Sequence, residues 1–183
     1  MAAISAKRGS LHAVFAQLWI YVNLSRKIFQ KILILFRTSM FNPTRIEVRQ
    51  FFCDTWQKYQ LREILSDMET ITLEVVLQHP EYHTILEKSE HYLEQNYPPE
   101  MGTTNPFLHM SMHVAIREQL AIDQPIGIRE KFLQLCKLTG DEHTAAHHTM
   151  ECLAETLWKS QHNQSAPDAT IYLDCMDRWL HKG

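Results

Sequence analysis

Apolar residues recur at intervals of three and four along most of residues 41–181, the period of one face of an α-helix. No stretch alternates apolar and polar residues in the way that a half-buried β-strand does. The pattern therefore predicts an all-α fold: a single-domain bundle of about six or seven helices over residues 42–181, the longer ones antiparallel.

Helix-start and helix-stop signals divide this pattern. Asn42-Pro43 and Asn105-Pro106 each place a capping residue before a proline, and Ser66 precedes Glu69 by three positions, as in a capping box. Proline residues and Gly140 mark the C-terminal ends of the expected helices. The expected helices cover residues 43–59, 66–79, 80–95, 106–122, 126–138, 141–160 and 167–181.

The stretch from Asp141 to Trp158 carries the most distinctive polar pattern. Asp141 is an expected N-cap, and His143, His147 and Glu151 then follow at intervals of four, which places them on one ridge of the helix. The two histidines fall at the edge of the apolar side, and Glu151 falls further out. Imidazoles facing a core with a carboxylate at the margin suit a metal site in a helical bundle.

Histidine spacing extends this observation beyond one helix. The chain has 11 histidines, and three pairs have the spacing HxxxH: His79/His83, His109/His113 and His143/His147. Chance predicts roughly 0.7 such pairs. Because Pro80 disfavours helical backbone at residue 79, the first pair need not share a ridge. The other two pairs lie in uninterrupted helices and face the core.

Two imidazoles one turn apart can converge on one metal ion. We therefore expect the 106–122 and 141–160 helices to pack with their histidine faces inward. The candidate ligands are His109, His113, His143 and His147, with Glu151 as a fifth, and the candidate ions are Zn, Fe, Mn and Ni. The glutamate of a metalloprotease HExxH is missing, and so is the ExxH of di-iron bundles.

The alternative interpretation is that these histidines are hydrogen-bonded core residues, with partners among Asn105, Ser111, Gln119 and Thr144. The protein would then be a non-enzymatic helical interaction module. The sequence has no phosphate-binding loop and no GxSxG, and it identifies no catalytic residue, no reaction and no cofactor other than a transition metal.

The four cysteines, Cys53, Cys136, Cys152 and Cys175, lie far apart and form no CxxC. This spacing indicates reduced thiols and a cytoplasmic protein. Cys152 follows His148 by one turn, which raises the idea of a Cys–His nucleophile pair. Angular counting instead puts Cys152 on the outer side of its helix, away from a buried site.

Charge separates residues 1–39 from the helical domain expected over residues 40–183. The first segment holds six of the 18 basic residues and none of the 21 acidic ones, so the domain itself is acidic and no nucleic acid partner is expected. Residues 1–39 are also apolar, but too mixed to span a membrane. They are either upstream translated sequence or a membrane-surface helix, and any membrane contact is expected through them alone.

From Met40 onward the chain resembles a bacterial family of uncharacterised proteins, the domain of unknown function 1841. The segments that carry the resemblance are MFNPTR at 40–45, HPEYH at 79–83, TNPFLHMSMHVAI at 104–116, QLAIDQP at 119–125 and MECLAETLW at 150–158. The resemblance covers nearly all of residues 40–180. It implies an all-helical bacterial protein that starts at or near Met40, and it implies no activity.

Deleting residues 1–39 is expected to leave the thermal unfolding temperature unchanged, because the helical signals of the domain begin independently at Asn42-Pro43. The measurement compares residues 40–183 with the full chain. A decrease of several degrees, or aggregation of the truncated form alone, would contradict the prediction.

Overall fold

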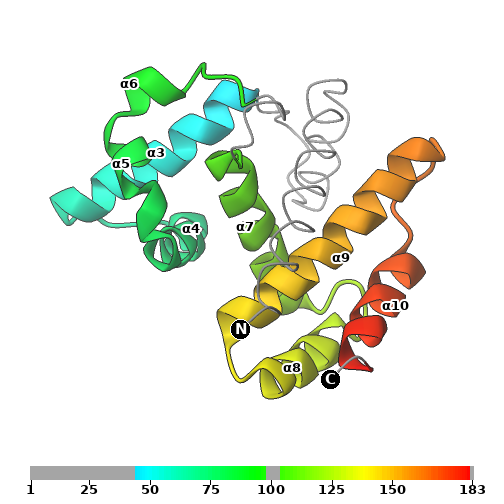
Figure 1. Ribbon diagram of the computed structural model, residues 1–183. Helices are drawn as coiled ribbons and strands as arrows, with labels where there is room; N and C mark the ends of the chain where they lie inside the picture. Colours follow the sequence, from blue (N-terminus) through cyan, green and yellow to red (C-terminus); the bar gives the residue numbers. More distant parts are fainter. Residues whose placement is uncertain (1–43, 98–103, 182–183) are drawn as a thin grey trace, which may run out of the picture.

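The computed structural model describes residues 44–97 and 104–181, and within these ranges every regular element is a helix (Figure 1). The all-α prediction is confirmed. Predictions for residues 1–39 and for Asn42-Pro43 lie outside the described residues. The elements are α3 (Arg45–Leu61), α4 (Asp67–Gln78), the 3-10 helix η1 (Pro80–Tyr82), α5 (His83–Glu87), α6 (Ser89–Tyr92), α7 (Pro106–Ile122), α8 (Ile128–Thr139), α9 (Glu142–His162) and α10 (Ala169–Leu180).

Side-chain caps begin α4, α7 and α9 where the sequence predicts them, and Thr44 begins α3 with a capping box of its own. Ser66 and Glu69 form the predicted capping box of α4, and Asn105 and Asp141 accept hydrogen bonds from the first backbone N–H groups of α7 and α9. These side chains satisfy donors that would otherwise lack partners. Gly140 ends α8 with φ of 71°, a left-handed conformation that costs glycine little. The boundaries around the histidine-bearing helices are thus encoded locally.

The prediction of one helix over residues 80–95 is wrong. The segment consists of η1, α5 and α6, and Lys88 leaves the helical region between the last two. The buried Arg49 guanidinium donates to the carbonyl oxygens of Tyr92, Leu93 and Gln95 at 2.8–3.1 Å. A long-range partner therefore satisfies carbonyl groups at the end of α6, as a helix cap does.

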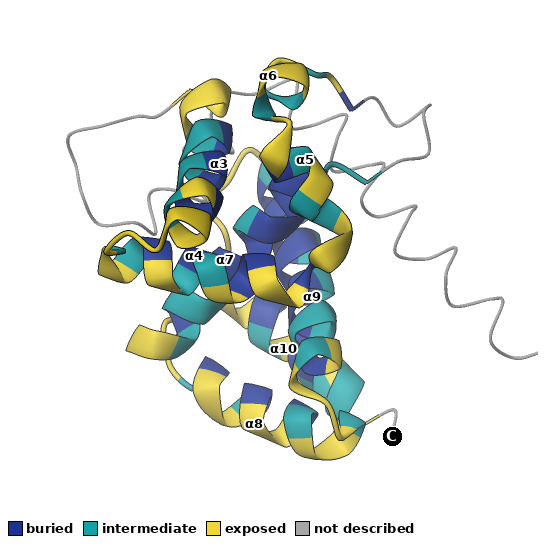
Figure 2. Ribbon diagram, turned by 90° about the vertical axis from the view of Figure 1, so that its left-hand side faces the viewer, coloured by how far each residue is buried: buried dark blue, intermediate teal, exposed yellow. Residues whose placement is uncertain are grey.

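Helix α7 is shared by two hydrophobic cores, and burial in Figure 2 is accordingly densest on the central helices. Leu108, Met112 and Ile116 pack into the C-terminal core with α8, α9 and α10. Met110 and Val114 pack into the N-terminal core with α3, α4 and α5. The sequence predicts a single apolar side for this helix, but two-sided packing buries nearly its whole circumference. The seam between the cores therefore runs along α7.

A disulfide corrects the expectation of four reduced cysteines. Cys152 on α9 and Cys175 on α10 are bonded, with an S–S distance of 2.03 Å, whereas Cys53 and Cys136 are free. Cys152 is fully buried, so its expected outer position is also wrong. The two cysteines are 23 positions apart and meet only because α9 and α10 pack together. The argument from reduced thiols to the cytoplasm no longer holds.

Among the described helices, none combines the length and the apolar content needed to cross a bilayer.

Replacing Tyr172 with Phe is expected to lower the free energy of unfolding by about 1–3 kcal/mol. The Tyr172 hydroxyl of α10 donates to Gln119 Oε1 of α7 at 2.9 Å, and both side chains are buried. The variant leaves the Gln119 oxygen unsatisfied in the core. Urea unfolding measures the effect, with Tyr59→Phe as the control because Tyr59 is 43% exposed. Equal stability of the two variants would contradict the prediction.

Candidate metal centre

Five imidazole rings from three elements meet at the seam between the two cores. His79 ends α4, His109 and His113 lie on α7, and His143 and His147 lie on α9. The ring of His79 lies 4.6, 4.7, 4.9 and 6.2 Å from the other four rings, taken in sequence order. One ring thus stands close to all the others.

The expectation that the two longer histidine-bearing helices pack with these faces inward is confirmed. The rings of His109 and His147 lie 5.2 Å apart, and those of His113 and His143 lie 5.3 Å apart and nearly parallel. The Nε2 atoms of His113 and His147 are separated by 3.1 Å. The two HxxxH ridges therefore converge on one region.

Four of the five histidines form a tight group. One ligand atom from each of His79, His113, His143 and His147 lies within 4.8 Å of the others. His109 lies outside this group but adjoins it, with its Nε2 3.2 Å from that of His113. Glu151 is half-buried on α9 and is not a member of the group. Its role as a fifth ligand stays a prediction.

His79 is the member that sequence reasoning missed. Pro80 correctly indicates a helix end there, and a helix end at this point does not by itself place His79 beside the other pairs. The structure places His79 in the cluster through this break: the residue leaves the helix with φ of −124° and is 1% exposed. His83 lies apart, bonded to the carbonyl oxygen of Val76 and stacked on Trp56. The sequence signal for His79 is the dipeptide His79-Pro80, which ends α4 in a chain that also carries two helices with HxxxH pairs.

Hydrogen bonding orients His79 towards the cluster. Its Nδ1 lies 2.8 Å from Glu81 Oε1, and its Nε2 is buried with no hydrogen-bond partner in the described part of the chain. The Nδ1 of His143 is also buried and has no hydrogen-bond partner among the described residues. A carboxylate on one ring nitrogen with the other nitrogen left open is the arrangement of many metal-binding histidines.

The contacts around His113 exceed what hydrogen bonding alone explains. Its Nε2 faces two other imidazole nitrogens, that of His109 at 3.2 Å and that of His147 at 3.1 Å. An imidazole nitrogen carries either one hydrogen or one lone pair. It can therefore make one good hydrogen bond in this plane and leaves the second contact unsatisfied.

The polar residues proposed as partners for core histidines bond elsewhere. Asn105 caps α7, Ser111 donates to the carbonyl oxygen of Phe107, and Thr144 donates to the Asp141 carboxylate. Gln119 accepts from Tyr172. These contacts weaken the interpretation of ordinary hydrogen-bonded core histidines.

Burial favours the neutral form of four of these imidazoles, those of His79, His109, His113 and His147. It lowers the pKa of His109 to about 3 and of His147 to about 4, and it lowers the pKa of His113 further, with neighbouring histidines adding to each effect. Burial also lowers the pKa of His79, although the Glu81 carboxylate opposes this. Neutral imidazole is the form that binds metal ions.

Comparison with known proteins gives a family and no activity. A family model described as a domain of unknown function, DUF1841, matches residues 44–178. Neither a search of curated proteins nor a search of solved structures returns a match.

The metal-free protein is expected to lose stability as the pH falls from 7 to 5. An unfolded histidine takes up a proton near pH 6.5, whereas His147 in the fold has a pKa of about 4. The unfolded state therefore binds more protons in this window, which costs roughly 2 kcal/mol at pH 5 for His147 alone. Urea unfolding of chelator-treated protein at both pH values measures the loss.

His147→Gln is expected to reduce this pH dependence, and His91→Gln is the matched control because His91 is exposed. If the unfolding free energy changed equally with pH in both variants, burial of His147 would not be the source of the pH dependence.

Proposed function

The chain belongs to the DUF1841 family, and we propose that it binds a divalent transition metal ion at the histidine cluster. The proposed ligands are His79, His113, His143 and His147, and His109 is the neighbouring candidate for a further position. The observation that carries the proposal is the convergence of two Nε2 atoms, from His109 and His147, on the Nε2 of His113, which can make only one hydrogen bond to a neutral ring.

The distances between the imidazole nitrogens are close to those expected around a bound transition metal ion. Two nitrogens each about 2.0–2.1 Å from a tetrahedral ion are about 3.3–3.4 Å apart. The Nε2 atoms of His113 and His147 are 3.1 Å apart, and the widest separation in the group of four is 4.8 Å. Small rotations of the side chains would bring the outer nitrogens onto a common ion.

The donor set narrows the choice of ion. Carboxylate and water oxygens suit Mn²⁺, whereas imidazole suits Zn²⁺, Fe²⁺ and Ni²⁺. The group of four contains imidazoles alone, with the Glu81 carboxylate held on the far nitrogen of His79. We therefore favour Zn²⁺, Fe²⁺ or Ni²⁺ over Mn²⁺ as the bound ion.

Elemental analysis of protein purified without a histidine tag tests the proposal. About one equivalent of transition metal is expected, with thermal stabilisation of the stripped protein when the ion is restored, worth about 2.7 kcal/mol at a hundredfold excess over Kd. Less than about a tenth of an equivalent, with no stabilisation by Zn, Fe, Mn or Ni, would contradict it and favour the interaction module with structural histidines.

Variants separate ligands from other histidines. His113→Gln and His79→Gln are expected to abolish stoichiometric binding, whereas the exposed His91→Gln is expected to bind normally. Glu81→Gln removes the partner of His79 Nδ1 and keeps every ligand, so a weakening of about 10–100-fold is expected. Full affinity in Glu81→Gln would show that this carboxylate does not tune the site.

A further inference from the structure

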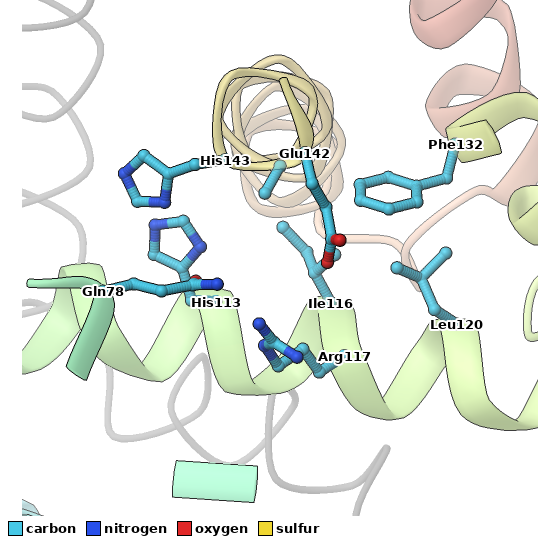
Figure 3. A pocket seen from close by; sticks show the side chains of 9 residues that line it. Gln78, His113, Ile116, Arg117, Leu120, Phe132, Glu142 and His143 are labelled. Atoms are coloured by element: carbon cyan, nitrogen blue, oxygen red, sulfur yellow. The ribbon is translucent and has the colours of Figure 1, made fainter. Parts of the chain in front are cut away.

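A small cavity adjoins the histidine cluster between α7 and α9. Figure 3 shows the rings of His113 and His143 at one end, with the side chains of Arg117 and Glu142 pointing into the space. The cavity measures about 20 Å³. One water molecule needs a cavity of about 10–15 Å³, so this cavity accepts a group of one or two water-sized atoms.

With a divalent ion bound at the cluster, the charges around this cavity would favour an anion. Four neutral imidazoles would leave the double positive charge of a bound ion uncompensated. The Arg117 side chain is 27% exposed, and its Nη1 donates to Glu74 Oε2 at 2.8 Å. A guanidinium carries five N–H donors, so this pair leaves donors for a second acceptor. The Glu142 carboxylate points into the same space and offsets the charge of Arg117, so the net positive charge that attracts an anion would come from the bound ion.

The cavity also indicates whether the proposed metal site would be structural or reactive. Structural zinc sites are closed by protein ligands, whereas reactive sites keep a position for an exogenous ligand. Two of the four proposed ligands, His113 and His143, form part of the cavity wall. A small molecule in the cavity would therefore lie against the ion's own coordination shell.

We propose that the metal centre keeps one coordination position for a small anionic ligand, which enters through this cavity and accepts a hydrogen bond from Arg117. This inference rests on the proposed metal binding and adds to it the chemical class of the exogenous ligand: an anion with a narrow donor end, such as hydroxide or azide. Of the remaining walls, Ile116, Leu120, Phe132 and Ala146 are apolar and Gln78 contributes an amide, and the small volume excludes a broad group.

Azide titration of the full chain loaded with Co²⁺ tests the proposal. Cobalt binding is read from its visible d–d absorption, and azide is expected to shift these bands saturably. Benzoate, which is too broad for the cavity, is expected to leave them unchanged. Bound cobalt whose spectrum does not respond to azide overturns the exogenous position and leaves the proposed metal binding intact. Absence of cobalt binding overturns both.

Arg117→Gln isolates the role of the guanidinium. Azide is expected to bind about tenfold more weakly or worse, since a charge-assisted hydrogen bond is lost, while the affinity for Co²⁺ is unchanged. Arg117→Lys is expected to recover part of the azide affinity. Arg178→Gln makes the same charge change at an exposed position on α10, where Arg178 pairs with Glu155. Equal azide affinities in Arg117→Gln and Arg178→Gln overturn the assignment of Arg117.

Discussion

Packing of five imidazole rings between two hydrophobic cores, three of them buried and two half-buried, is the constraint on which the centre of this molecule depends. Rings packed there have lost most of their water, and the nitrogens of His79 and His113 do not regain full hydrogen bonding within the described structure. An unsatisfied buried polar group costs about 1–3 kcal/mol. The fold therefore keeps metal-ligand nitrogens buried at its seam, although apolar side chains in their place would avoid this cost in stability.

Helix α7 makes this arrangement possible because both cores use it. Its two histidines lie between the face that packs on α8, α9 and α10 and the face that packs on α3, α4 and α5. His79 arrives from the N-terminal core, and His143 and His147 arrive from the C-terminal core. The two halves of the molecule thus meet through imidazoles, and an ion at this position would link them directly.

Local signals in the chain predicted much of this architecture. The capping residues Ser66, Asn105 and Asp141 lie where the sequence placed them, and the spacing of the α7 and α9 histidines put both pairs on inward faces. The single helix predicted after Pro80 is divided at Lys88, and the buried Arg49, 43–46 positions away, satisfies the carbonyl groups at the end of the segment.

By itself, the sequence determined the all-α class, the main helix starts and the inward faces of His109, His113, His143 and His147. These features depend on hydrogen bonds and periodicity within one or two helical turns, which a chain encodes locally. Tertiary structure alone decided that His79 joins the cluster and that Cys152 meets Cys175. Those outcomes depend on how whole helices pack, since side chains remote in sequence converge only when two cores close around the same helix.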